Sequence, residues 1–156
     1  KPRSNEVDGV DYHFISNERF KNLIKENQFY EYAKIFDNFY GTLKNDVDQL
    51  IIKNDIIFDI DWQGTKQLSK FKKLNLVKIF LIPDTKLELK KRLITRNQNT
   101  PDEIDRRFKA FDEDIKHWND YDYIFINKNL EVCFRQIESI ILEKKNKISI
   151  FSQTAQ

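Results

Sequence analysis

Two arginines, Arg92 and Arg96, lie four residues apart in a segment with helical hydrophobic spacing, so their side chains share one helix face. No acidic residue lies between them, and like charges in this arrangement repel each other unless an anion bridges them. Arg106 and Arg107 follow after the polar segment 97–100, which suits a closing lid. Phosphoryl transfer needs such cations, because the transferring group spreads negative charge over its oxygens. The pattern indicates either a phosphate-binding cluster or a solvated basic face.

A second group of residues has the hydrogen-bonding capacity to bind a purine. Glu31 lies in an aromatic, apolar segment, which is unfavourable for a carboxylate unless it has a donor partner. Guanine presents N1–H and N2–H₂ donors beside the O6 acceptor, and the carboxylates of Glu31 and Asp59 with the Thr42 hydroxyl match that edge. Adenine would leave these groups unpaired, which can discriminate between substrates by roughly 10⁴-fold. Alternatively, Glu31 is exposed on a half-buried strand, and Asp59 caps the following helix.

A third group near the N-terminus combines Arg3 with the phenols Tyr12 and Tyr40, and Glu6 is close to Arg3 in sequence. An arginine fork and phenol hydroxyls suit a phosphate monoester, and a neighbouring carboxylate can hold an arginine in one rotamer. The alternative is a solvated loop together with two core tyrosines.

The apolar run 56–60 is predicted to be a strand buried on both faces, and it is the element around which these groups are organised. The carboxylates Asp59 and Asp61 lie at its C-terminal end, and residues two apart point to the same side of a strand. Ligands of open α/β sheets bind at this carboxyl end of the strands. Gly64 then allows a change of direction before a helical pattern resumes.

From residue 55 onward, predicted strands alternate with predicted helices, which indicates a parallel sheet with helices on both faces. The aromatic region before residue 42 is predicted to be a small antiparallel subdomain with a hairpin turn at Asp37-Asn38. The expected strands span residues 12–15, 29–35, 39–40, 56–60, 77–82 and 123–126. The expected helices begin at the caps Ser16, Thr42, Asp84 and Thr100, near Trp62, and near Leu130.

Composition narrows the class of protein. The chain has 156 residues, enough for one domain, and its formal net charge of +2 does not favour nucleic acid or a membrane as the main partner. No apolar run approaches the ~20 residues of a membrane span. Cys133 is the single cysteine, which excludes a disulfide framework within the chain and fits a cytoplasmic location. The two histidines are far apart and lack a cysteine pair, so no zinc site is expected.

With these groups in order, the chain strongly resembles the guanylate kinases of bacterial type, which phosphorylate GMP with ATP. The resemblance extends from Lys1 to about residue 146 and rests on KPRSNEVDGVDYHF, QFYEYAKIFDNFYGT, IFDIDWQG, LKKRLITRNQNT and the RRFKAF helix. It implies that the GMP phosphate is held by Arg3, Tyr12 and Tyr40, with Glu6 supporting Arg3. It implies that guanine is bound by Glu31, Thr42 and Asp59, with Gly41 close to the ligand. It implies that the ATP phosphates and the transferring group are held by Arg92, Arg96 and Arg107.

The resemblance also implies a fold: a P-loop NTPase-like parallel sheet with helices on both faces, a small β-rich GMP-binding subdomain and a helical lid. One domain is then expected over 1–156, with the GMP-binding subdomain in 1–42, the core in 43–83 and 108–146, the lid in 84–107 and a tail in 147–156. Mg²⁺ is expected to accompany ATP, and the resemblance leaves a homo-oligomer open.

The chain departs from the family pattern in one major respect. The family carries a G-x-x-x-x-G-K-[ST] phosphate loop upstream of the position of Lys1, and no such sequence occurs in these residues. We therefore expect the chain to be part of a longer enzyme and to be inactive alone. The rival class is the guanylate-kinase-like interaction domain of scaffold proteins, but that class usually lacks the Asp-x-Asp-x-Gln-Gly element and the lid arginines. Both features are present here, at 59–64 and at Arg92 and Arg96.

Overall fold

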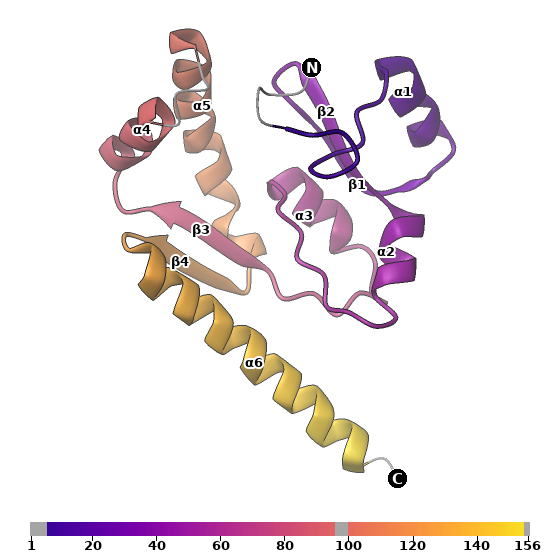
Figure 1. Ribbon diagram of the computed structural model, residues 1–156. Helices are drawn as coiled ribbons and strands as arrows, with labels where there is room; N and C mark the ends of the chain where they lie inside the picture. The colour runs from indigo at the N-terminus through magenta and orange to yellow at the C-terminus, as the bar shows by residue number, and fades with distance from the viewer. Residues whose placement is uncertain (1–5, 96–99, 155–156) are drawn as a thin grey trace. The chain divides into compact units, whose positions relative to one another are not determined.

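The computed structural model describes residues 6–95 and 100–154, so Arg3 and Arg96 lie outside the described residues. The chain divides into two compact units, an N-terminal unit (residues 1–78) and a C-terminal unit (residues 79–156), which are described separately. Figure 1 labels their elements.

The N-terminal unit is organised around the antiparallel hairpin of β1 (Phe29–Ile35) and β2 (Asn38–Leu43), which confirms the predicted hairpin. Helix α1 (Asn17–Lys25) precedes it and begins as predicted at Ser16, whose hydroxyl accepts a hydrogen bond from the Arg19 amide. Phe20 of α1 stacks on Phe29, with 4.6 Å between the ring centroids, so α1 is fixed to the hairpin by aromatic packing.

Two further helices complete this unit: α2 (Lys44–Leu50) and α3 (Trp62–Leu68). Helix α3 packs against β1, as Figure 1 shows. The hydrophobic core of the unit combines the buried side chains of Tyr30, Val47, Leu68 and Leu74.

The segment before α3 differs from its prediction as a strand buried on both faces. Residues 55–61 form no strand; Ile56, Phe58 and Ile60 pack against the core, whereas 85% of Ile57 is exposed. A strand needs hydrogen bonds from a neighbouring strand, and no strand of the described chain pairs with this segment. The segment therefore packs only one of its faces.

The C-terminal unit contains β3 (Ile79–Pro83) and β4 (Tyr123–Asn127), which pair in parallel. Between them the chain forms α4 (Lys86–Thr95), α5 (Pro101–Asp114) and a 3₁₀ turn, η1 (Ile115–Asp120). A helical connection between parallel strands is the βαβ arrangement that the sequence predicts, so the chain is an α/β protein.

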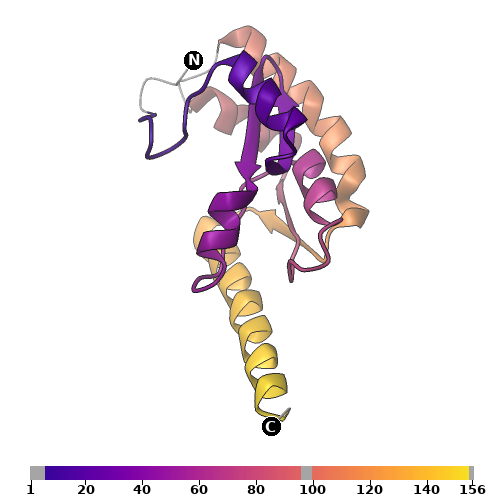
Figure 2. The ribbon, with the colours of Figure 1, turned by 90° about the vertical axis from the view of Figure 1, so that its right-hand side faces the viewer.

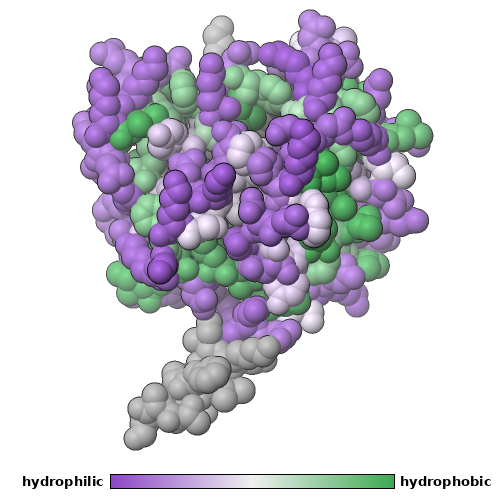
Figure 3. Space-filling view, turned by 180° about the vertical axis from the view of Figure 1, so that it is seen from behind, coloured by the Kyte–Doolittle hydropathy of each residue, from purple (hydrophilic) through white to green (hydrophobic). Residues whose placement is uncertain are grey.

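Helix α6 (Leu130–Thr154) follows β4, and Figure 2 shows it extending beyond the strands of its unit as one continuous helix. Neither α6 nor another helix in the described ranges combines the length and apolar character needed to cross a membrane. Figure 3 shows hydrophobic side chains at the surface among hydrophilic ones.

Three further local predictions are wrong. Residues 12–15 form no strand, and their strand-like pairing is limited to an isolated bridge between Asp8 and Tyr12. Thr42 lies in β2 and does not cap α2, because its hydroxyl is bonded to Glu31 instead. Asp84 does not cap α4; the Thr85 hydroxyl accepts the Glu88 amide in its place.

By contrast, the predicted start of α5 is confirmed. The Thr100 hydroxyl accepts from the Glu103 amide, the Glu103 carboxylate accepts from the Thr100 amide, and Pro101 occupies the first turn. This capping box depends only on residues within one turn of each other, which is why the sequence predicts it correctly.

Candidate functional site

The strand register brings together residues of two predicted groups. Glu31 is paired with Thr42 and Ala33 with Tyr40 across the hairpin. Alternate residues of a strand point to the same side, so these four residues lie on one side of the hairpin, which we call the hairpin face. The predicted base-binding and phosphate-binding groups therefore each contribute a residue of β2 to one surface.

Glu31 and Thr42 are in direct contact on the hairpin face. The Thr42 hydroxyl donates a hydrogen bond to Oε1 of Glu31 at 2.6 Å, and Glu31 is only 4% exposed. The alternative in which Glu31 is an exposed strand residue is therefore wrong. Burial raises the pKa of the Glu31 carboxyl above its ordinary value, the Thr42 hydroxyl opposes that shift, and the charge of Asp61 adds to it.

The first turn of α3 approaches the same carboxylate. Asp61 is the N-cap of α3, where its side chain accepts from the Gly64 amide at 3.0 Å. A Cβ atom placed on Gly64 would lie 2.7 Å from Oε2 of Glu31, closer than real Cβ contacts. Gly64 lies inside α3, so its absence of a side chain makes room for Glu31 and does not serve a change of chain direction.

Asp59 lies two residues before this cap. Its alternative role as the helix cap is wrong, because Asp61 has that position. Asp59 is exposed and forms no hydrogen bond or ion pair with another residue of the described chain. Its carboxylate is open to solvent, and its contact with guanine stays a prediction.

The loop before α1 is held by two aspartates for which no sequence pattern predicted a role. Asp8 accepts from the Phe14 amide and Asp11 from the Val7 amide, both at 2.8 Å. Directly after Asp11, the ring centroid of Tyr12 lies 5.8 Å from that of Tyr40 in an edge-on arrangement. The loop thus brings the two predicted phosphate-binding phenols together, and Glu6 is half-buried at its start.

Gly41 lies in β2 on the side opposite to the hairpin face. A Cβ atom there would come within 3.0 Å of the Phe29 ring and 3.1 Å of the Phe20 ring. Packing of α1 on the hairpin therefore explains a glycine at this position, and its approach to a nucleotide stays a prediction.

In the C-terminal unit, Arg92 is held at two points. Its Nε donates to the Glu88 carboxylate at 2.9 Å, and one terminal nitrogen donates to the backbone carbonyl of Asn127 at 2.8 Å. Asn127 is the last residue of β4, so the guanidinium lies at the carboxyl end of the parallel strands. Glu88 was not predicted, although its i, i+4 spacing to Arg92 was the available signal.

Arg107, the other described member of the predicted arginine set, is a half-buried residue of α5. Helices α4 and α5 are joined by an ion pair between Lys86 and Asp112 and by Lys90 over the Phe108 ring. The helix bearing Arg92 is thus linked both to β4 and to the helix bearing Arg107.

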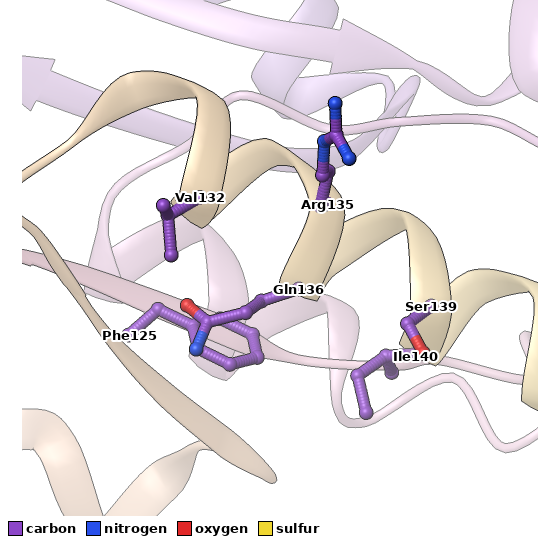
Figure 4. Close-up of a pocket in the computed structure, with 6 residues that line it drawn as sticks. All are labelled: Phe125, Val132, Arg135, Gln136, Ser139 and Ile140. Atoms are coloured by element: carbon purple, nitrogen blue, oxygen red, sulfur yellow. The ribbon is translucent and has the colours of Figure 1, made fainter.

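An open hollow of about 430 Å³ lies elsewhere in this unit, between β4 and α6 (Figure 4). Phe125 comes from β4, and the other lining residues, Val132, Arg135, Gln136, Ser139 and Ile140, come from α6. None of the predicted site residues lines it, so it supports none of the predicted chemistry.

The raised pKa of Glu31 gives a pH dependence with a definite sign. The Glu31 carboxyl binds a proton more tightly in the folded protein than in the unfolded chain. The stabilisation of the folded state by this protonated carboxyl is therefore fully present below the ordinary pKa of 4.5. It is lost as the pH rises through the raised pKa. The free energy of unfolding of the wild type minus that of Glu31→Gln is therefore expected to decrease as the pH rises from 4.5. Urea unfolding at a series of pH values measures it, and a constant or increasing difference contradicts the burial of an ionisable Glu31.

Comparison with known proteins covers almost the whole chain. The family model for guanylate kinase matches residues 1–144. The guanylate kinase of Clostridioides difficile (strain 630) is 43% identical over 150 residues, covering 96% of this chain and 73% of that protein. The guanylate kinase of Paramagnetospirillum magneticum is 37% identical over 147 residues, covering 94% of this chain and 69% of that protein.

A solved structure agrees with these sequence matches. The crystal structure of guanylate kinase from Anaplasma phagocytophilum matches with a TM-score of 0.77 and 28% sequence identity. The match covers 92% of this chain and 70% of that one. The range matched by the family model includes the hairpin face, the first turn of α3 and Arg92.

Proposed function

This chain belongs to the guanylate kinase family, and from that premise we propose that it takes part in transfer of the ATP γ-phosphoryl group to GMP. The products are ADP and GDP. The observation that carries the proposal is the buried Glu31 carboxylate, bonded to the Thr42 hydroxyl on the hairpin face.

Guanine recognition is proposed for Glu31, Asp59 and Thr42. Carboxylates accept from the N1–H and N2–H₂ groups of guanine, and the Thr42 hydroxyl donates to O6. In the described structure that hydroxyl donates to Glu31, so it must rotate to reach O6. The buried Glu31 carboxylate then loses the Thr42 hydroxyl as a donor and gains an N–H donor from guanine. Adenine has no N1–H group that could replace the hydroxyl.

The GMP phosphate is proposed to bind beside the base, at Tyr12 and Tyr40 together with Arg3 and Glu6. The support is the contact between the two phenol rings and the position of Tyr40 on the hairpin face. Gly41, which lies between Tyr40 and Thr42 in β2, is also proposed to contribute to GMP binding.

Phosphoryl transfer is proposed to depend on Arg92, Arg96 and Arg107, which neutralise the charge of the transferring group. An oxygen of the GMP phosphate attacks the γ-phosphorus in line, and the bond from that phosphorus to the ADP oxygen breaks. No covalent nucleophile of the protein is required, so positioning and charge neutralisation account for the rate. Residues 84–107 are proposed as the lid that closes over the nucleotides.

Mg²⁺ is proposed to be bound with ATP. No group of three or more His, Cys, Asp or Glu side chains in the described ranges is arranged to hold a metal ion. Mg²⁺ in kinase sites commonly uses one or two carboxylates together with substrate phosphates, so such a cluster is not needed. When bound, the ion neutralises charge on the ATP phosphates.

The proposed location is the cytoplasm, which suits a chain whose single cysteine, Cys133, is a free thiol.

Isothermal titration calorimetry on this chain tests the proposal. GMP is expected to bind and AMP to bind at least tenfold more weakly, because Glu31 and Asp59 stay unpaired beside adenine. Activity is measured on the complete natural protein with ATP, Mg²⁺ and GMP. Absence of heat at millimolar GMP would contradict the proposed site and favour the scaffold-domain alternative.

A further inference from the structure

We propose that Gln67 and Gly64 of α3 are positioning residues that set the Glu31 carboxylate for guanine and thereby determine nucleotide specificity. This inference rests on the proposed function and adds two residues to it. Neither residue is expected to touch the nucleotide; both act through Glu31.

The first observation is a two-point contact between Gln67 and the backbone of β1. The side-chain Nε2 of Gln67 donates to the Tyr32 carbonyl at 2.7 Å, and its Oε1 accepts from the Tyr32 amide at 3.2 Å. The N–H and C=O of one strand residue point to the same edge of the strand, so the amide of Gln67 pairs with β1 as a neighbouring strand would. Tyr32 directly follows Glu31, so this pairing fixes the backbone of Glu31 relative to α3.

The second observation is the space left by Gly64. It lies three residues before Gln67, so both residues lie on one side of α3. Oε2 of Glu31 lies 2.7 Å from the position that a Cβ atom of residue 64 would have. Helix α3 therefore approaches β1 so closely that a Cβ atom at position 64 would force the Glu31 carboxylate or the helix to shift.

The two observations together define the position of Glu31. Gln67 sets the separation of α3 and β1, Gly64 admits the carboxylate between them, and the Thr42 hydroxyl binds its other oxygen at 2.6 Å. Glu31 itself is 4% exposed, so its carboxylate cannot avoid a displacement by moving into solvent. A shift of the helix would change the direction of an acceptor whose hydrogen bonds depend on geometry.

The test compares GMP and AMP affinities for Gln67→Ala and Gly64→Ala by calorimetry on this chain. We expect each variant to reduce the GMP-to-AMP affinity ratio about 5- to 20-fold, because misaligned hydrogen bonds to a charged acceptor lose part of their strength. Gln49→Ala is the matched control: Gln49 is also a helical glutamine of the N-terminal unit and bonds a residue four positions earlier, Asn45. The GMP-to-AMP affinity ratio of Gln49→Ala is expected to equal that of the wild type.

A purely structural role would lower the thermal stability of Gln67→Ala and leave the affinity ratio unchanged, and that result overturns the inference. A second measurement does not depend on GMP binding. Carboxyl NMR titration should show the pKa of Glu31 moving toward its ordinary value in Gln67→Ala, because a displaced helix buries the carboxyl less. An unchanged pKa of Glu31 in Gln67→Ala overturns this inference, whatever the nucleotide preference of the wild type. Absence of a preference for GMP in the wild type is a separate result, and it would overturn the proposed function.

Discussion

Replacing Arg92 with alanine is expected to lower kcat of the complete enzyme by roughly 10²- to 10³-fold, the range for removing one preorganised group that stabilises transition-state charge. KM for GMP should change far less, since the base and phosphate of GMP are assigned to residues of the N-terminal unit. The structure supports a large effect on kcat and a small one on KM, because Arg92 is already oriented by Glu88 and by the carbonyl of Asn127. Preorganisation of this kind removes the cost of orienting the guanidinium during the reaction.

Steady-state kinetics of Arg92→Ala measures the effect, and α6 supplies a matched control. Arg135 pairs with Glu131 through the same Nε to Oε1 contact at 2.9 Å and the same i, i+4 spacing, but both side chains are well exposed. Arg135→Ala should therefore retain wild-type kcat. Equal losses of kcat and GMP affinity in Arg92→Ala would contradict a role confined to the transferring group.

Replacing Glu31 with glutamine is expected to lower GMP affinity by roughly 10- to 100-fold, since hydrogen bonds to a charged group contribute about 1.5–3 kcal/mol. AMP affinity should change little, so the preference for GMP decreases by nearly the same factor. The physical reason is that glutamine keeps the size of the side chain but replaces one acceptor oxygen by a donor. That donor then faces the N–H groups of guanine.

Calorimetry with GMP and AMP measures this effect on the chain itself. Glu26→Gln is the control, because it removes one negative charge from an exposed position in the same unit. Glu31→Gln with an unchanged ratio of GMP to AMP affinity would exclude Glu31 from base recognition. Thr42→Val then tests the hydroxyl separately, since valine keeps the β-branched shape that suits β2.

Local sequence signals predicted much of the secondary structure correctly. The Ser16 cap, the capping box at Thr100 and the β1–β2 hairpin each depend on residues close together in the chain. Hydrophobic spacing placed the parallel strands β3 and β4 to within a few residues. The resemblance to guanylate kinases came from several such segments in order, and the family comparisons confirm it.

Some residues in the sequence are compatible with two structural roles, and only tertiary contacts decided between those roles. A threonine before a helix can cap it, but Thr42 donates to Glu31 across the hairpin instead. A glycine after a strand can provide a turn, but Gly64 provides space for a carboxylate 33 positions earlier in the sequence. The run 56–60 has the composition of a buried strand, yet burial on both faces requires neighbours that residues 55–61 lack in the described chain.

The sequence by itself determined which chemistry this chain carries: the acidic, hydroxyl and basic side chains, their order, and the family to which that order belongs. The tertiary structure decided how those groups are held, through Thr42 on Glu31, Gln67 on the edge of β1, and Asn127 on Arg92. The reason is that caps and hydrophobic periods arise within one or two helical turns. The direction of a buried acceptor, in contrast, depends on contacts between residues that only folding brings together.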